Sequence, residues 1–474
     1  MTTSVLLGID VGSTNIKVVA ASPDGAGLLQ VDDSTPWVSL CHGRTEMTAE
    51  SLIEVVAALL ERCVTELDAR YGPVEVAGIG VSGMAESGVL LDDAGHVAGP
   101  AMAWFDPRGG AEIAAAPIEF RREMLRRTGL PVNALATVSK LLHLRDRGVD
   151  LRGRTWLNVP ELVVHALGGR RVSELSLAAR TGLLDQDDLA PWPAALELVG
   201  AEPDLLPARV RAGDVCGHAA AVAGVAGLRR SLPAAVRGAA LTVAGHDHLV
   251  AAAGGGVVEP GQLYLSMGTA EALVRVVEGS VSADVRARLA GEGINAVPHV
   301  VRDRTVLLAG TRSGLLLRRV LRLTGSSGRG ALEELDRAVL ALPPEGGAAA
   351  AAIEVDGART HDGVLGLRIS GDDLSPAVLF AAVLAHGTQA CLDRLAVMDR
   401  EVSPAVSTLA SGGWTRMACV RQARSAVLPD VAFSSREEET AFGAALFAAY
   451  AAAGSAAAGP LADFGAAFRS VSTR

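Results

Sequence analysis

The residues best suited to chemistry near the N-terminus lie in a short polar turn, residues 10–15, between two apolar runs. These runs have strand length and β-branched content, which predicts a β-hairpin. Asp10 ends the first run, and Gly12, Ser13 and Thr14 follow with a bare amide and two hydroxyls. A carboxylate that can face a metal ion, beside donors for an anion, suits the phosphates of a nucleotide. An ordinary hairpin turn is the alternative interpretation.

A second stretch, residues 263–275, repeats this layout. A predicted strand ends near Ser266, a turn contains Gly268 and Thr269, and a second apolar strand follows. Asp10 falls opposite Ser266 when the two stretches are compared. We interpret the match as a distant internal duplication, which predicts two related domains that face each other across a cleft.

Polar side chains that suit a polyhydroxylated ligand lie between the two hairpins. Glu86 follows a predicted strand, and Trp104, Asp106 and Arg108 come next at alternating positions. One strand face or loop edge can therefore present all three. Such a ligand needs polar groups and one apolar wall, which this set supplies. The alternative is that Trp104 fills the core, while Asp106 and Arg108 pair at the surface.

Asp247 carries a carboxylate directly after a predicted strand. The strand at 239–244 leads into it, and it is the only carboxylate in residues 243–258. One possible role for Asp247 is that of a helix cap, because an Ala- and Gly-rich segment follows. His246 and His248 flank it, but positions two apart do not share a helix face, and no third ligand cluster is evident. We therefore expect these two histidines to be packing or supporting groups and not metal ligands.

Several elements must position these residues. Thr48 can cap a helix that runs to Arg70, and Ser375 followed by Pro376 opens a long helix. A predicted strand at 405–410 ends in Ser411-Gly412-Gly413-Trp414, a turn whose bare backbone can lie against a flat ring. The low-complexity segment 345–352 is predicted to be a surface loop.

A dinucleotide-type Gly-x-Gly-x-x-Gly pattern occurs at Gly78, Gly80 and Gly83, after a predicted strand. Residues 84–92 then continue as a second strand and do not open a helix. The pattern therefore gives little support to a nicotinamide oxidoreductase, which would rest on it alone.

The composition predicts a large soluble protein. At 474 residues the chain exceeds one hydrophobic core, and we expect two large domains. A net charge of −10 argues against a nucleic-acid partner. Lysine occurs only at Lys17 and Lys140, which excludes a Walker loop. The uncharged run 441–464, broken only by Asp463, is rich in Ala and Gly and predicts tight helix packing, not a membrane span.

The five cysteines are odd in number and widely spaced, and the N-terminus does not look like a secretory signal. We therefore expect a reduced, cytoplasmic protein. The sequence leaves the oligomeric state open, and a homodimer is one expectation.

Taken together and in order, these motifs resemble the FGGY family of carbohydrate kinases over nearly the whole chain. The resemblance implies an α/β fold with two actin-like, ribonuclease-H-like ATPase domains and an active site in the cleft between them. It places a sugar-binding domain at residues 1–243 and an ATP-binding domain at residues 244–474. The implied activity transfers the γ-phosphate of ATP to a hydroxyl of a small ketose or polyol, with Mg²⁺ as cofactor.

The resemblance also implies roles for residues. Asp10 would hold Mg²⁺ through water, and Asp247 would take the proton of the sugar hydroxyl. The sugar would be bound by Asp247 together with Glu86, Trp104, Asp106 and Arg108. ATP would be bound by the glycines, hydroxyls and lysine of the phosphate and adenine motifs: Gly12, Ser13, Thr14, Lys17, Gly268, Thr269, Gly314, Gly412 and Gly413.

Three departures from the family pattern leave alternatives open. Ala85 stands where glycerol kinases carry Arg, so the substrate motif resembles xylulose- and fuculose-type kinases more than glycerol kinases. Xylulose kinases carry a Met-His pair where this chain has Ala85-Glu86. Trp414 replaces a usual third Gly, and His386 replaces a usual Glu. The identity of the sugar stays open. An actin-like or chaperone-type ATPase without a sugar substrate would share the same hairpins and is the alternative function.

Overall fold

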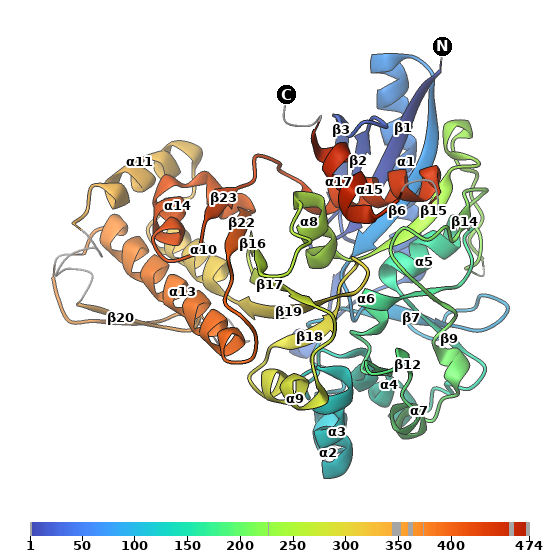
Figure 1. Ribbon diagram of the computed structural model, residues 1–474, viewed down its shortest axis with the longest axis horizontal. Helices are drawn as coiled ribbons and strands as arrows, with labels where there is room; N and C mark the ends of the chain where they lie inside the picture. The colour runs from blue at the N-terminus through green and yellow to red at the C-terminus, as the bar shows by residue number, and fades with distance from the viewer. Residues whose placement is uncertain are drawn as a thin grey trace.

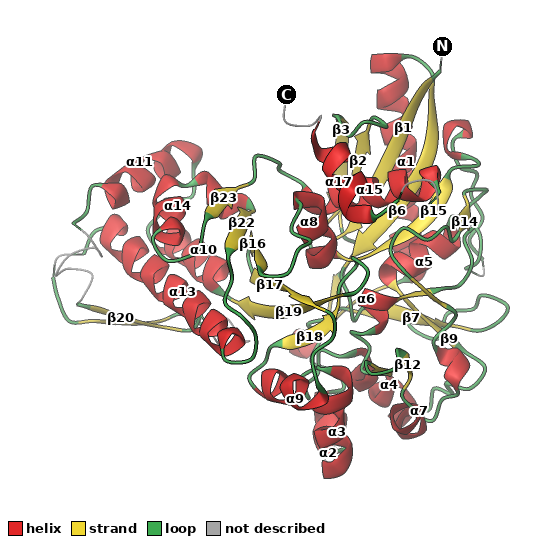
Figure 2. Ribbon diagram, in the orientation of Figure 1, coloured by secondary structure: helices red, strands yellow, loops and turns green. Residues whose placement is uncertain are grey.

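The computed structural model describes residues 2–225, 227–343, 352–358, 364–372, 374–454 and 459–470. The chain forms two halves, each built around a six-stranded sheet. Figures 1 and 2 show the first sheet with β1 and β6 on the right and the second with β16 and β22 near the centre. The predicted surface loop at 345–352 lies, apart from Ala352, outside the described residues.

The first sheet has the strand order β14-β15-β6-β1-β2-β3. Its central strands β1, β6 and β15 are parallel, whereas β2 and β3 add to β1 as antiparallel neighbours. The predicted N-terminal hairpin is thus confirmed as β1 and β2. The strands are β1 (Thr3–Val11), β2 (Asn15–Ala21), β3 (Gly27–Ser34), β6 (Val74–Gly83), β14 (Gly217–His218) and β15 (Ala240–His246).

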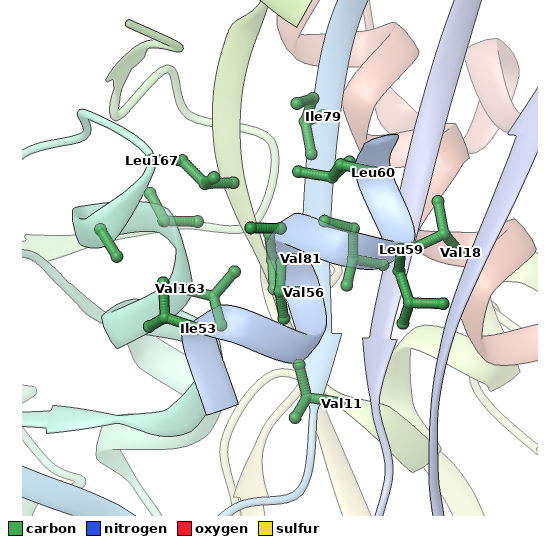
Figure 3. Close-up of a cluster of buried hydrophobic side chains, with 14 of the residues drawn as sticks. Val11, Val18, Ile53, Val56, Leu59, Leu60, Ile79, Val81, Val163 and Leu167 are labelled. Carbon is green, nitrogen blue, oxygen red and sulfur yellow. The ribbon is translucent and has the colours of Figure 1, made fainter. Parts of the chain in front are cut away.

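One face of this sheet is covered by α1 (Ala49–Tyr71) and α5 (Val159–Ala166). Thr48 caps α1 as predicted, because its side chain accepts a hydrogen bond from the amide of Ser51. Figure 3 shows the aliphatic core between these layers, with Val56 and Leu60 of α1 turned toward Ile79 and Val81 of the sheet. This core fixes the strands whose ends carry the site.

The opposite face is covered by α15 (Glu439–Ala453), which is most of the uncharged run predicted to pack tightly. A Cβ on Gly8 would lie 1.9 Å from the carbonyl oxygen of Ala441, and one on Gly80 would lie 2.0 Å from that of Ala444. The bare strand surface lets the helix backbone approach closely. The Gly-x-Gly pattern of β6 therefore serves helix packing and is not a cofactor turn.

The second sheet has the order β18-β19-β17-β16-β22-β23. It repeats the first layout, because β16 and β17 form an antiparallel hairpin whose first strand pairs in parallel with β22. The predicted internal duplication agrees with this shared topology. The strands are β16 (Gln262–Met267), β17 (Glu271–Glu278), β18 (Asn295–Pro298), β19 (Arg304–Thr311), β22 (Ser407–Ser411) and β23 (Val431–Phe433).

Four helices stand beside this second sheet in Figure 1: α10 (Ser313–Leu323), α11 (Arg329–Leu340), α13 (Pro376–Asp399) and α14 (Ala418–Ser425). Ser375 caps α13 by accepting from the amide of Val378, with Pro376 at the first helical position, as predicted. The strands β20 (Ile353–Asp356) and β21 (Gly366–Ile369) form an antiparallel pair, and β20 contacts α13.

The remaining elements are short and mostly lie between β6 and β15 in sequence. The strands are β4 (Val38–Ser39), β5 (Thr45–Met47), β7 (Gly88–Leu91), β8 (Ala101–Met102), β9 (Thr155–Asn158), β10 (Ser173–Glu174), β11 (Leu184–Asp185), β12 (Ala190–Pro191) and β13 (Arg209–Val210). The helices are α2 (Gly110–Ala115), α3 (Ile118–Thr128), α4 (Thr137–Asp146), α6 (Leu175–Ala178), α7 (Pro193–Val199), α8 (Asp247–Gly255), α9 (Ala283–Gly291) and α17 (Leu461–Ser470).

The C-terminal part of the chain returns to the first sheet. Helix α15 contacts β1, β6 and β15, and α8 packs on α15. The proposed boundary between residues 243 and 244 stays a prediction. Within the described ranges, none of the helices combines the length and hydrophobicity needed to cross a bilayer.

Candidate active site

Three strand ends of the first sheet meet at one edge. Asp10 is the last but one residue of β1, Glu86 follows β6, and Asp247 follows β15. Because β1, β6 and β15 are parallel neighbours, their carboxyl ends lie side by side: Asp10 pairs with Ser82, and Ser82 pairs with Gly245. The sheet thus brings together three carboxylates that are far apart in the sequence.

Asp10 is buried, and its Oδ1 has no hydrogen-bond partner. Burial raises the pKa of Asp10 well above its usual value, the nearby Asp247 raises it further, and Lys17 opposes both. An unpaired buried carboxylate calls for a cation. Asp10 therefore has the properties of a residue that faces a metal ion, directly or through water.

Asp247 is the first residue of α8, the helix that contains the Ala- and Gly-rich segment. Burial alone would raise its pKa, but His248, His246, the amide of His248 and Arg180 outweigh burial, so the pKa of Asp247 is lowered. Its Oδ1 accepts from that amide at 2.6 Å and lies 3.2 Å from Nε2 of His246. The side chain is 20% exposed. Asp247 is therefore an ionised carboxylate that a substrate can reach.

Glu86 is buried and forms an ion pair with Arg180. Nε of Arg180 donates to Oε1 of Glu86 at 2.6 Å, and Nη2 donates to the same oxygen. Nη1 of Arg180 is buried and has no partner. Glu86 has a φ of 63°, a left-handed conformation that is strained for a glutamate. A strained acid beside an unsatisfied guanidinium donor offers an acceptor and a donor to a ligand hydroxyl.

Trp104 connects the predicted sugar-binding segment, residues 104–108, to the first phosphate turn, which is the turn at residues 10–15. Its indole Nε1 donates to Oγ of Ser13 at 2.8 Å, and its ring stands edge-on to Phe105, with centroids 5.3 Å apart. Trp37 donates to the carbonyl of Ser13 at 2.9 Å. The two tryptophans hold the turn between β1 and β2, so Trp104 is not a simple core filler.

Asp106 and Arg108 form a buried bidentate pair, because Nε and Nη2 of Arg108 donate to the two carboxylate oxygens. The amide of Thr45 also donates to Asp106, and Nη1 of Arg108 donates to Glu46 at 2.7 Å. These contacts use most of the donors and acceptors of the pair. The sugar-binding role assigned to these two residues stays a prediction.

Lys140 lies behind this pair and was not among the predicted site residues. Its ammonium donates to the carbonyl oxygens of Asp106, Arg108 and Ala134. Burial lowers the pKa of Lys140 to about 8, against the opposing effect of Asp106 and Glu86. It ties the loop that carries Trp104 to helix α4.

Lys17 lies on β2, opposite Asp10 in the hairpin register. Its ammonium lies 2.5 Å from Oε2 of Glu438, the residue before α15. Glu438 also raises the pKa of Asp10. The first phosphate turn is therefore linked to the start of α15 by an ion pair that no sequence pattern predicted.

The second half brings three predicted glycines together. The strand ends of β16, β19 and β22 lie at one edge, and they lead to Gly268, Gly314 and Gly412. A Cβ on Gly314 would lie 1.9 Å from the carbonyl oxygen of Gly268, and one on Gly412 would lie 2.6 Å from that of Met267. Gly412 also has a φ of +102°. The missing side chains therefore let three segments meet backbone to backbone.

The other predicted nucleotide residues surround this point. Thr14 and Thr269 are exposed at the two turns, and Nη1 of Arg318 donates to Oγ1 of Thr269 at 3.4 Å. Gly413 has open space around its Cβ position. Trp414 packs near Phe380, with ring centroids 6.3 Å apart. These positions agree with binding of ATP, which stays a prediction.

Sequence reasoning missed Arg180, Glu438 and the contacts of Lys140. Lys140 carried one signal, since it is one of two lysines in the chain. Arg180 carried none, because a single arginine after an apolar segment has no distinctive pattern. The described ranges contain no cluster of three or more ligating side chains. The expectation that His246 and His248 are not metal ligands stays a prediction.

Comparison with curated proteins places this geometry in a family. A model of the N-terminal domain of the FGGY family of carbohydrate kinases matches residues 5–254. L-fuculokinase of Escherichia coli is 25% identical over 295 residues, which are 61% of this chain and 60% of that protein. Gluconokinase of Bacillus subtilis is 21% identical over 58% of this chain and 52% of its own length. The matched region thus spans about 60% or less of these relatives.

Solved structures agree on the fold over nearly the whole chain. Xylulose kinase from Rhodospirillum rubrum has a TM-score of 0.77 at 21% identity and covers 94% of this chain and 90% of its own. Gluconate kinase from Lactobacillus acidophilus has a TM-score of 0.79 at 16% identity and covers 98% of this chain and 92% of its own. The predicted α/β fold with two actin-like halves is confirmed. Since the family model matches more than half of the residues of this chain, the chain belongs to the FGGY family of carbohydrate kinases.

Proposed function

We propose that this chain transfers the γ-phosphate of ATP to a hydroxyl group of a small ketose or polyol. The observation that carries the proposal is the position of Asp247, an ionised and partly exposed carboxylate beside Asp10 and the Glu86–Arg180 pair. Family membership supports the same activity, since its members are carbohydrate kinases. The relatives are named for different substrates, so the proposal stays at this class.

The mechanism follows from the side chains at the strand ends. Glu86 accepts from a sugar hydroxyl, Nη1 of Arg180 donates to another, and Trp104 supplies an apolar wall. Asp247 orients the attacking hydroxyl and takes its proton late in the transfer, which suits a carboxylate that is ionised at neutral pH. The turns at Ser13 and Gly268 donate to phosphate oxygens.

Asp10 fits a role toward Mg²⁺. Its Oδ1 is buried and without a partner, and the described residues hold no cluster of three or more ligating side chains. That combination suits Mg²⁺, which is commonly held by one or two carboxylates, water and substrate phosphates. When bound, the ion supplies positive charge to the phosphates. Positive charge near Asp10 would also favour its ionised form, against the effect of burial.

An ATP-coupled screen tests the activity. ADP formation is measured with ketoses, aldoses, polyols and sugar acids, with and without Mg²⁺. We expect one acceptor class to stimulate ADP formation well above the basal rate. ATP hydrolysis that no acceptor stimulates would contradict the proposal and favour an actin-like or chaperone-type ATPase.

Asp247→Asn tests the catalytic base. The amide keeps the shape and the helix-start position of Asp247 but cannot take a proton. We expect kcat to fall by about 10²–10⁴-fold while sugar and ATP still bind. A folded variant that binds sugar and turns over at a near-normal rate would leave Asp247 only its role at the start of α8.

The expected partner is the small sugar or polyol itself, and we propose a cytoplasmic location. The five cysteines are free, and four of them are buried, which suits a reducing compartment. A homodimer stays an expectation, which the molecular mass in solution would test.

A further inference from the structure

Arg312 is a cation at the junction between the two halves. It lies between β19 and α10 in the second half, and its backbone amide donates to the carbonyl of Ala358 at 2.8 Å. Its guanidinium carbon lies 5.8 Å from the centroid of the Trp104 ring, which belongs to the first half. The side chain therefore reaches across from one half to the other.

The guanidinium has no acidic partner within the described ranges. Four arginines that are more deeply buried do have an acidic partner: Arg180 pairs with Glu86, Arg275 with Asp399, Arg286 with Asp187, and Arg424 with Glu271. Burial lowers the pKa of Arg312, and no neighbouring charge opposes that effect. A half-buried guanidinium without a counter-charge is costly unless an anion joins it.

The surroundings of Arg312 indicate which anion fits. The ring under its guanidinium belongs to Trp104, which donates to Ser13 in the first phosphate turn at 2.8 Å. Two residues after Arg312, Gly314 lies so close to the second phosphate turn that an added Cβ would be 1.9 Å from the carbonyl oxygen of Gly268. The cation therefore lies close to both turns proposed to hold the phosphates of ATP. A phosphoryl group between these turns is the anion best placed to neutralise the charge of Arg312.

We infer that Arg312 donates hydrogen bonds from the second half to the γ-phosphoryl group of ATP as that group moves to the acceptor. This role rests on the proposed kinase function. In the step, the acceptor oxygen forms a bond to the γ-phosphorus, and the bond from that phosphorus to the β,γ-bridging oxygen breaks. The hydroxyl proton goes to Asp247, and the electron pair of the broken bond stays on ADP.

Arginine suits this position because of its shape and charge. Its planar fork can donate two parallel hydrogen bonds to phosphate oxygens, which gain negative charge during the transfer. The ring of Trp104 supports the guanidinium from one side and leaves its edge free to donate. Because Arg312 and Trp104 come from different halves, the contact also depends on how closely the halves approach.

The test compares Arg312→Ala and Arg312→Lys with Arg322→Ala, which changes an exposed arginine on α10, the helix that follows Arg312. We expect Arg312→Ala to lower kcat by about 10²–10³-fold, the usual worth of one donor to a developing charge. The KM of the sugar and the Kd of ADP should stay within about threefold of wild type, because neither ligand carries the γ-phosphoryl group. Arg312→Lys should recover part of kcat, and Arg322→Ala should behave as wild type.

A binding measurement separates this inference from the proposed function. ADP with aluminium fluoride, Mg²⁺ and an acceptor mimics the group in transfer, and a non-hydrolysable ATP analogue carries a γ-phosphate without reaction. We expect Arg312→Ala to weaken the binding of both analogues more than the binding of ADP. Failure of the wild-type protein to phosphorylate any acceptor would overturn the kinase proposal. The affinity for each analogue relative to ADP, compared between wild type and Arg312→Ala, tests the role of Arg312 separately. Near-normal turnover, or equal losses for ADP and the analogues in a folded variant, would overturn the inference.

Discussion

Gly314→Ala should disturb the second phosphate turn more than any other single methyl group added at a predicted site residue. The ideal Cβ at this position lies 1.9 Å from the carbonyl oxygen of Gly268 and 2.7 Å from Nε1 of Trp414. Real Cβ atoms do not come within 3.0 Å of such an oxygen, so the start of α10 and the turn must separate by about 1.1 Å.

The size of the effect follows from this displacement. A shift of about 1 Å in a group that positions a substrate costs about 100-fold in rate. That factor equals about 2.7 kcal/mol of transition-state stabilisation. The overpacking itself costs about 1–3 kcal/mol of the free energy of unfolding. A protein with about 5–15 kcal/mol of stability stays folded, so the change appears mainly in activity.

The assay measures kcat/KM for ATP at a saturating acceptor, with a thermal unfolding curve for each variant. Gly330→Ala is the matched control, because Gly330 lies on α11 in the same half and no atom outside its chain neighbours and its own helix backbone lies within 4 Å of its Cβ position. The control should match wild type in both measurements. A folded Gly314→Ala protein with kcat/KM within about threefold of wild type would refute the claim that close backbone contact sets this turn.

Two further predictions concern the first half. Glu86→Gln leaves Arg180 buried without its counter-charge, so we expect a loss of about 3–5 kcal/mol in the free energy of unfolding. We also expect the KM of the sugar to rise more than the KM of ATP. Equal rises in the two KM values would show that Glu86 has a purely structural role. Burial lowers the pKa of His246 to about 3, so the folded protein keeps this ring neutral while the unfolded chain binds a proton below about pH 6.5. Stability is therefore lost as the pH falls from about 6.5 toward 3, by about 2 kcal/mol between pH 7 and pH 5. Chemical denaturation at both pH values should show a smaller loss of stability in His246→Asn than in wild type. The control His218→Asn, which changes an exposed histidine, should behave as wild type. Identical losses of stability in all three proteins would contradict the assignment of this pH dependence to His246.

Local patterns in the sequence determined much of the fold and of the site. The runs around residues 10–15 and around Gly268 predicted hairpins, because strand length, β-branched residues and turn residues act over a few neighbours. The same local physics predicted the caps at Thr48 and Ser375. Asp10 and Asp247 were predicted as site residues because each carries a carboxylate close to the end of a buried strand, and parallel strands bring such ends to one edge.

Tertiary structure alone decided which distant side chains meet. Arg180 lies 94 residues from Glu86, and Glu438 lies 421 residues from Lys17, so no local period or spacing connects either pair. The glycines of β6 fit a cofactor pattern in the sequence, yet α15 from the other end of the chain packs on them. Arg312 gains its place over Trp104 only when the two halves come together. The physical reason is that local sequence fixes backbone conformation, whereas burial, ion pairing and the unpaired charge of Arg312 depend on the assembled surfaces of both halves.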